Sequence, residues 1–226
     1  LIGPTGAGKS TFANKLSGSN FETEGVVSCT QDIHLAPPFL LDGRKVTLVD
    51  TPGLDDTFKP TTEIFGLIVE FLKATFEKGT KVDGILYFHP ITDVRIGGMA
   101  RANFRRFRKL CGAQTLQNVT IVTTRWDDVA RDVGACRQEA LAAQEAAFKP
   151  ALDDGARLVA HDGSVPSAHR ILREALRTPP QPLSVQREMV EEGKVLIDTA
   201  VGQDLAAGLS EKEAMHRAGL EEVRQE

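Results

Sequence analysis

Short apolar runs alternate with longer amphipathic stretches along most of the chain. The runs have the length and β-branched content of strands, and the amphipathic stretches between them are helix-like. The predicted strands are Leu1–Ile2, Ile33–Leu41, Lys45–Asp50, Gly84–His89, Val119–Thr123 and Arg157–Ala160. Strands that alternate with helices are typical of a three-layer α/β domain with a mainly parallel sheet.

The clearest helix is predicted over Thr62–Lys78, where apolar residues recur every three or four positions and Gly79 follows as a stop. Similar boundary signals predict further helices at Lys9–Leu16, Gly98–Leu110, Gly134–Phe148 and Ser167–Leu176. The second and third strands have no helix between them. Asp42 and Gly43 predict a tight hairpin there, so this pair should be antiparallel and lie at one edge of the sheet.

The pattern changes at Thr178-Pro-Pro-Gln-Pro182, because consecutive prolines prevent helix formation and favour an extended linker. We therefore predict a domain over residues 1–177, a linker over 178–182 and a helical tail over 183–226. The tail contains several glycines, each of which costs about 1 kcal/mol inside a helix relative to alanine. Its helix is predicted to be marginal, and its packing stays open.

Composition narrows the class of protein. Among 226 residues, 41% are hydrophobic and 26% are charged, which fits a globular domain. The net charge of −4 provides no positive field for nucleic acid. The apolar runs are shorter than the roughly 18 residues that cross a bilayer, although peripheral membrane contact stays open. Three scattered cysteines, Cys29, Cys111 and Cys136, indicate a reducing compartment, and we expect a cytoplasmic protein.

Residues 3–10 read Gly-Pro-Thr-Gly-Ala-Gly-Lys-Ser and match the P-loop pattern GxxxxGK[ST] between a strand end and a helix. In such a loop, backbone N–H groups turn toward phosphate oxygens. Lys9 would supply a catalytic charge to the β and γ phosphates, and the Ser10 hydroxyl would bind Mg²⁺. The predicted phosphate-binding residues are Gly3, Thr5, Gly6, Ala7, Gly8, Lys9, Ser10 and Thr11.

This loop also resembles that of ABC-transporter ATPases, so later residues must separate ATP from GTP. An ABC ATPase needs an LSGGQ-like signature, but Leu16-Ser-Gly-Ser19 lies too early and lacks the second glycine. The third strand instead ends in Asp50-Thr-Pro-Gly53, which resembles the DxxG element of translation-factor-like GTPases. Asp50 is expected to hold Mg²⁺, and the Gly53 N–H to meet the γ-phosphate.

Thr124-Arg-Trp-Asp127 follows the fifth strand and resembles the [NT]KxD element that binds guanine. A carboxylate at Asp127 accepts two hydrogen bonds that adenine cannot donate, which disfavours an ATPase. Arg125 replaces the usual lysine, but its stem and flat guanidinium can pack along the base. Thr124, Arg125 and Asp127 are therefore predicted to bind guanine. Residues 161–164 take the place of the last guanine loop without its usual string, so their role stays open.

Thr30 lies between the first helix and the second strand, where GTPases carry a threonine that contacts Mg²⁺ and the γ-phosphate. Together with Ser10 and Asp50 it makes up the predicted metal set. Loops that bind the γ-phosphate distinguish GTP from GDP, because hydrolysis removes their partner. The motifs therefore predict a switch.

The order of these motifs resembles the septin-like branch of GTPases, above all the immune-associated nucleotide-binding (GIMAP-like) family. The strings at residues 87–95 and 123–127 are most similar to those of fungal G-domain proteins. The resemblance covers about residues 1–176. It implies a Ras-like P-loop fold, whose central first strand would be truncated in this chain. It also suggests self-association through the nucleotide face, with a partner residue completing each site.

The residue that positions the attacking water is the missing part of this pattern. Ras-type enzymes carry Gln directly after the DxxG glycine, and here that position is Leu54. Hydrolysis is therefore expected to be slow or assisted by self-association. Arg95 and His89 are the candidates for the assisting group, although for His89 a strand-end histidine satisfied by backbone is the alternative.

A basic cluster follows Arg95 along the chain, in the predicted helix at 98–110. We interpret it as a solvated helix face, with Phe104 and Phe107 turned inward. Its members are Arg101, Arg105, Arg106, Arg108 and Lys109. A contact with a protein or an anionic surface is the alternative.

The predicted function is a switch that binds GTP or GDP with Mg²⁺ and hydrolyses GTP slowly. The second hypothesis is a nucleotide-stabilised scaffold or assembly module with negligible hydrolysis. Turnover that rises with protein concentration would distinguish the two, because assistance between molecules is second order.

Overall fold

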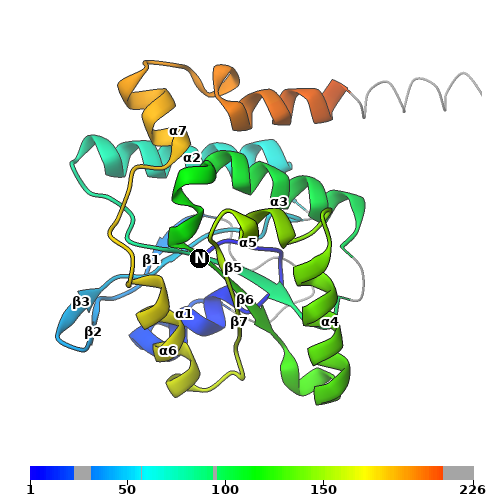
Figure 1. Ribbon diagram of the computed structural model, residues 1–226. Coiled ribbons are helices and arrows are strands. Elements are labelled where there is room, and N and C mark those ends of the chain that lie inside the picture. The colour runs from blue at the N-terminus through cyan, green and yellow to red at the C-terminus, as the bar shows by residue number, and fades with distance from the viewer. Residues whose placement is uncertain (23–31, 57, 94–95, 211–226) are drawn as a thin grey trace, which may run out of the picture.

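The computed structural model describes residues 1–22, 32–56, 58–93 and 96–210 (Figure 1). The strands are β1 His34–Leu35, β2 Phe39–Leu41, β3 Arg44–Val46, β4 Val49–Asp50, β5 Ile85–Pro90, β6 Val119–Thr124 and β7 Arg157–Ala160. The α-helices are α1 Lys9–Ser17, α2 Thr61–Glu77, α3 Gly98–Cys111, α4 Arg131–Ala143, α5 Lys149–Asp153, α6 Val165–Ala175 and α7 Ser184–Gln186. Shorter helical turns are η1 Ala113–Asn118, η2 Trp126–Asp128, η3 Arg187–Glu191 and η4 Leu196–Asp198, and residues 200–210 form a last helix.

The parallel part of the sheet has the order β5–β6–β7. Residues 1–2 continue it on the other side of β5, because the Ile2 N–H donates to Leu86 (2.9 Å) and the Phe88 N–H donates to Ile2 (2.7 Å). The amino group of Leu1 donates to the Val49 carbonyl at 2.6 Å. The short first strand therefore lies centrally, between β4 and β5, as predicted.

A cavity of about 620 Å³ adjoins this short strand. It is lined by residues of β3 and β4 on one side, residues 80–86 on the other, and α2 and α6 above and below. The cavity thus lies beside Leu1, between β4 and β5.

The antiparallel hairpin is confirmed, with Asp42 and Gly43 both at positive φ in its turn, but β2 and β3 pair with each other as a two-stranded sheet and do not form an edge of the parallel sheet. However, the predicted strand Ile33–Leu41 is wrong as a single element. Pro37 and Pro38 separate β1 from β2, because a proline nitrogen has no hydrogen to donate to a ladder. The predicted strand Lys45–Asp50 is also divided into two elements, since β3 pairs with β2 and β4 pairs with β1.

Helices cover both faces of the sheet, which confirms the three-layer prediction (Figure 1). Side chains of β5 alternate between the faces: Tyr87 packs in the core beneath α2 and α3, and Phe88 packs in the core beneath α1 and α6. Tyr87 lies in an aromatic cluster with Phe104 and Phe107, so these two phenylalanines point inward as predicted. The largest buried side chains of both cores come from these layers.

The predicted helix Gly134–Phe148 is also wrong as one element. Helix α4 ends at Ala143, and Phe148 precedes α5. The Phe148 N–H donates to Leu141 at 3.2 Å, and its ring is buried in edge contact with Phe104. Helix α4 ends because Gln144 takes an extended conformation (φ −83°, ψ 124°), and the chain turns before α5. Within the described residues, no helix has the length and apolar character needed to cross a membrane.

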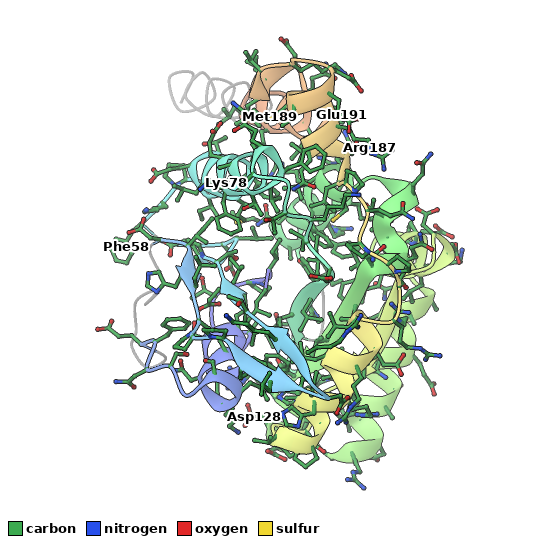
Figure 2. The ribbon with its side chains drawn as sticks, turned by 90° about the vertical axis from the view of Figure 1, so that its left-hand side faces the viewer. Phe58, Lys78, Asp128, Arg187, Met189 and Glu191 are labelled. Atoms are coloured by element: carbon green, nitrogen blue, oxygen red, sulfur yellow. The ribbon has the colours of Figure 1, made fainter. Side chains whose placement is uncertain are left out.

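The segment after the prolines packs on α2 and α3 (Figure 1). Its apolar side chains join the same core as those helices; they include Leu183, Val185, Met189, Val201 and Leu205. Figure 2 shows Met189 on the η3 turn, next to α2. The fully buried Gln186 donates from Nε2 to the Leu72 carbonyl at 2.9 Å and accepts from the Leu183 N–H at 2.9 Å. Residues 183–210 are therefore packed on the domain.

The basic cluster is only in part the solvated face that was predicted, because Arg101, Arg105 and Lys109 are exposed but Arg106 is buried. Asp204, on the helix at 200–210, accepts from Arg105 Nε (2.8 Å) and Arg106 Nε (3.2 Å) and pairs with Lys109 Nζ (2.8 Å). The Arg106 side chain is only 11% exposed. Gly208 leaves room for the Arg106 guanidinium, which a Cβ at this position would force to shift.

Burial raises the pKa of Asp204, but its hydrogen bonds with Arg105 and Lys109 outweigh burial and lower it to about 2. We expect Asp204→Asn to lower the free energy of unfolding by about 3 kcal/mol, because it leaves the buried Arg106 without its carboxylate. Urea unfolding at pH 7 would measure the loss.

Asp198→Asn is the matched control, since Asp198 is an exposed carboxylate on the same segment. It should change the stability by less than about 0.5 kcal/mol. Because the pKa of Asp204 is lowered, its contribution is complete above pH 4 and is lost as the pH falls through 2, so the difference between the wild-type protein and Asp204→Asn should shrink over that range. Equal free energies of unfolding for Asp204→Asn and Asp198→Asn at pH 7 would contradict the prediction.

Candidate functional site

The P-loop, residues 3–10, runs from the end of the first strand into α1. Gly3 has a positive φ of 148°, and a Cβ at this position would lie 3.1 Å from the carbonyl carbon of Phe88 and even closer to its oxygen. Gly8, with φ 90°, leads directly into the helix. At residue 3 only glycine tolerates both the conformation and the contact with β5, and at residue 8 the positive φ favours glycine. The two glycines therefore shape a loop of backbone N–H groups. Among its other predicted residues, Ala7 is buried, and Thr5, Gly6 and Thr11 are exposed.

Lys9 is buried inside this loop. Its Nζ donates to the carbonyls of Gly3 (3.1 Å) and Pro4 (2.8 Å). Burial lowers the pKa of Lys9 to about 8, although the charges of Asp50, Asp55 and Asp56 oppose the shift. The ammonium group is thus held by weak acceptors that phosphate oxygens can replace.

Ser10 and Asp50 meet at the end of β4. The Ser10 hydroxyl donates to Asp50 Oδ2 at 2.5 Å, and Asp50 is fully buried. Its second oxygen, Oδ1, is buried and has no hydrogen-bond partner in the part of the chain that the structure describes. A buried carboxylate oxygen without a donor is costly unless a cation satisfies it. The pair therefore fits Mg²⁺, with Ser10 and Asp50 as its protein-side ligands. The third predicted ligand, Thr30, lies outside the described residues.

The loop that begins with the DxxG element closes on the P-loop. Gly53 lies against Thr5: a Cβ on Gly53 would stand 2.7 Å from the Thr5 nitrogen. The Leu54 N–H donates to the Gly3 carbonyl at 3.1 Å, and Asp55 Oδ1 accepts from the Thr5 N–H at 2.6 Å. The Leu54 side chain is 1% exposed and lies in the core, so it cannot orient water.

Sequence reasoning missed two residues of this loop's surroundings. Asn103, on α3, donates from Nδ2 to the Leu54 carbonyl at 2.8 Å and is buried. No motif marks it, because its partner lies 49 positions away. Asp55 could have been noticed, since two acidic residues follow Leu54, directly after the DxxG element.

The predicted guanine loop is joined to the P-loop by a buried hydrogen bond. The Thr124 hydroxyl donates to the Ala7 carbonyl at 2.9 Å. Arg125 has a positive φ of 60°, and its Nε donates to Asp128 at 2.7 Å. Asp127 lies in the η2 turn, and its carboxylate is exposed. The threonine therefore sets the distance between the two loops, and Asp127 is accessible to a base.

Residues 161–164 lie beside the guanine loop. The His161 N–H donates to the Thr123 carbonyl at 2.8 Å, and Lys15 Nζ donates to the Gly163 carbonyl at 2.5 Å. Three segments distant in sequence, at residues 7–15, 123–127 and 161–164, are thus tied together by hydrogen bonds at one edge of the sheet.

His89 does not lie on an exposed face. It is 4% exposed, its ring contacts Phe148 edge-on at 5.2 Å, and burial lowers its pKa to about 4. Its Nε2 has no hydrogen-bond partner among the described residues. The alternative, a strand-end histidine whose ring is satisfied by backbone, is therefore wrong for this atom. Burial excludes His89 as the group offered to a second molecule. Arg95, the other candidate, lies outside the described residues.

Comparison with known proteins agrees with this geometry. The sequence profile of the 50S ribosome-binding GTPase family matches residues 1–123. GTP-binding protein A of Dictyostelium discoideum is 27% identical over 136 residues, which are 58% of this chain and 28% of that protein. Immune-associated nucleotide-binding protein 10 of Arabidopsis thaliana is 29% identical over 137 residues, with the same shares of the two chains. The match thus spans little more than a quarter of each relative.

Solved structures show the same fold at low identity. Toc33 from Arabidopsis thaliana in complex with Mg²⁺ and GMPPNP has a TM-score of 0.59 at 16% identity, covering 79% of this chain and 84% of that one. Toc33 with GDP and Mg²⁺ has a TM-score of 0.55 at 17% identity, covering 80% and 85%. These similarities confirm the Ras-like P-loop fold.

The contact between Gly53 and Thr5 leads to a testable prediction. Gly53→Ala would place a methyl group against the Thr5 backbone and push the two loops apart, at a cost of about 1–3 kcal/mol. We expect a lower melting temperature and an affinity for GMPPNP about 10-fold weaker than that of the wild-type protein.

Gly66→Ala is the control, because a Cβ on this helical glycine meets nothing within 4 Å. It should leave the affinity unchanged and raise the melting temperature slightly. If Gly53→Ala behaved like Gly66→Ala in both measurements, the close contact of the loops would have no energetic role.

Proposed function

Because the chain belongs to the 50S ribosome-binding GTPase family, we propose that it is a guanine-nucleotide switch that binds GTP or GDP with Mg²⁺ and hydrolyses GTP slowly. The observation that carries this proposal is the pair Ser10–Asp50, with a buried Asp50 oxygen that has no donor, directly beside Lys9 in the P-loop. Mg²⁺ at this pair would neutralise charge on the phosphates.

Guanine specificity is assigned to the loop at residues 124–127. Thr124 holds this loop on the P-loop, and the exposed Asp127 carboxylate is available to the guanine N1 and N2 hydrogens. Arg125 supplies an aliphatic stem for the base. The switching elements are the loop at residues 50–56 and Thr30.

Slow hydrolysis follows from Leu54. Its buried side chain takes the place of the water-positioning glutamine, so a second molecule would have to complete the site. Dimerization is important for the GTPase activity of the chloroplast translocon components atToc33 and psToc159, which share this fold. We therefore propose a homodimer through the nucleotide face, with Arg95 as the assisting residue.

The buried Leu54 equally favours a second candidate, a scaffold or assembly module that nucleotide stabilises without turnover. As to location, the exposed free thiol of Cys136 supports a reducing compartment, and we propose the cytoplasm.

Nucleotide specificity can be tested by titrating fluorescently labelled GDP and ADP in the presence of Mg²⁺. We expect saturable GDP binding that ADP does not match. Lys9→Ala should weaken GDP binding by at least 10-fold, because it removes the charge from the phosphates. Asp127→Ala should weaken GDP binding and bring it close to that of ADP, because it removes the contact specific to guanine. GDP binding that Asp127→Ala leaves unchanged would refute the assignment of the guanine loop.

Assisted hydrolysis can be tested by measuring GTP turnover per molecule at increasing protein concentration. Turnover per molecule should rise and then level off when the dimer is saturated, since assistance between molecules is second order. Arg95→Ala should flatten this dependence without changing GDP affinity. A measurable rate that is independent of concentration would refute the dimer, and a negligible rate at every concentration would favour the scaffold.

A further inference from the structure

Asp55 belongs to the loop after β4, and its acidic side chain contacts the phosphate-binding loop. Its Oδ1 accepts a hydrogen bond from the Thr5 backbone N–H at 2.6 Å. The backbone N–H groups of a GxxxxGK loop are the donors that receive phosphate oxygens. In this structure a carboxylate oxygen therefore occupies one of the backbone donors of the loop.

The contact lies at the γ-phosphate end of the loop. Gly53, whose N–H is expected to meet the γ-phosphate, packs directly against Thr5. Backbone hydrogen bonds fix the chain on both sides of Asp55: the Leu54 N–H donates to the Gly3 carbonyl at 3.1 Å, and the Asp56 N–H donates to the Gly53 carbonyl at 3.1 Å. Asp55 is thus positioned by its neighbours and does not reach Thr5 by chance rotation of a free side chain.

The charge of Asp55 acts at the centre of the site. It opposes the lowering of the pKa of Lys9, the residue that reaches the β and γ phosphates. It also adds to the effect of burial in raising the pKa of Asp93 and of Tyr87. A triphosphate that enters this site must bring its most negative group close to this carboxylate.

We propose that Asp55 sets the preference between GTP and GDP, because its carboxylate is held on the P-loop backbone at the γ-phosphate end of the site and repels that phosphate. This inference rests on the proposed function. GDP has no γ-phosphate, so it leaves the contact between Asp55 and Thr5 in place. GTP must displace Asp55, and the displaced carboxylate moves the loop at residues 53–56 with it. The same residue thus weakens GTP binding and couples it to a movement of the loop.

The test compares the affinities for GMPPNP and GDP, both with Mg²⁺, in the wild-type protein and in two variants. Asp55→Ala removes the hydrogen bond and the charge, and it should strengthen GMPPNP binding by about 10- to 100-fold while changing GDP affinity by less than about threefold. Asp55→Asn keeps an oxygen that can accept the Thr5 N–H but removes the charge, so its gain should be intermediate.

Glu63→Gln is the matched control. Glu63 is a half-exposed carboxylate on the first turn of α2 that pairs with Lys59, so this change removes one nearby charge without touching the P-loop. It should leave the ratio of the two affinities unchanged. Melting temperatures of the variants would show that each is folded, and Asp55→Asn preserves the shape of the side chain if Asp55→Ala does not fold.

The outcomes separate the two proposals. Wild-type protein that binds GDP, together with an unchanged ratio in Asp55→Asn and Asp55→Ala, would overturn this inference alone. If Glu63→Gln changed the ratio of GMPPNP to GDP affinity by as much as the Asp55 variants do, the inference would also be overturned. The loss of a negative charge anywhere near the site, and not the contact with Thr5, would then be responsible. Wild-type protein that binds neither nucleotide would overturn the proposed function and this inference with it.

Discussion

Close backbone packing around Gly3 is the constraint on which the candidate site depends. The Cα of Gly3 lies against the carbonyl of Phe88 in β5, and its own carbonyl accepts from the Leu54 N–H and from Lys9 Nζ. The central sheet, the loop after β4 and the charged lysine therefore meet at one residue. A side chain there would separate all three, because interiors are close-packed and the contacts are with backbone atoms that cannot rotate away.

From this point a series of buried hydrogen bonds extends away from the nucleotide site. The Leu54 carbonyl accepts from Asn103 Nδ2 at 2.8 Å, and Asn103 Oδ1 accepts from Arg106 Nη1 at 3.2 Å. Arg106 then donates to Asp204 at 3.2 Å, on the helix at residues 200–210. Each group in this series has its polar atoms satisfied by the next, which is the condition under which buried polar groups stabilise a fold. The loop that closes on the P-loop and the C-terminal segment thus rest on the same face of α3.

The candidate site combines groups suited to bind phosphate and Mg²⁺ with a buried leucine in place of a water-positioning residue. Lys9, Ser10 and Asp50 are buried or half-buried around the P-loop, and Asp50 keeps one oxygen without a donor among the described residues. At the position where Ras-type enzymes orient water, however, Leu54 faces the core. Asp55, the next residue, places its charge toward the P-loop. This arrangement supports the proposed switch, in which a partner would have to assist turnover.

Local patterns in the sequence determined the P-loop, the DxxG and TRWD elements, the hairpin turn and the bounds of α1, α2, α3 and α6 to within two residues. These features depend on neighbours within a few positions, and their spacing is therefore visible in one dimension. Only the tertiary structure decided the turn that brings Phe148 into the core and the burial of His89. It also decided that Asp204 binds Arg105, which lies 99 positions away, and that Asp55 contacts Thr5 across 50. A charged residue has the same local pattern whether it faces water or a distant partner, because only the packing of the layers brings that partner within reach.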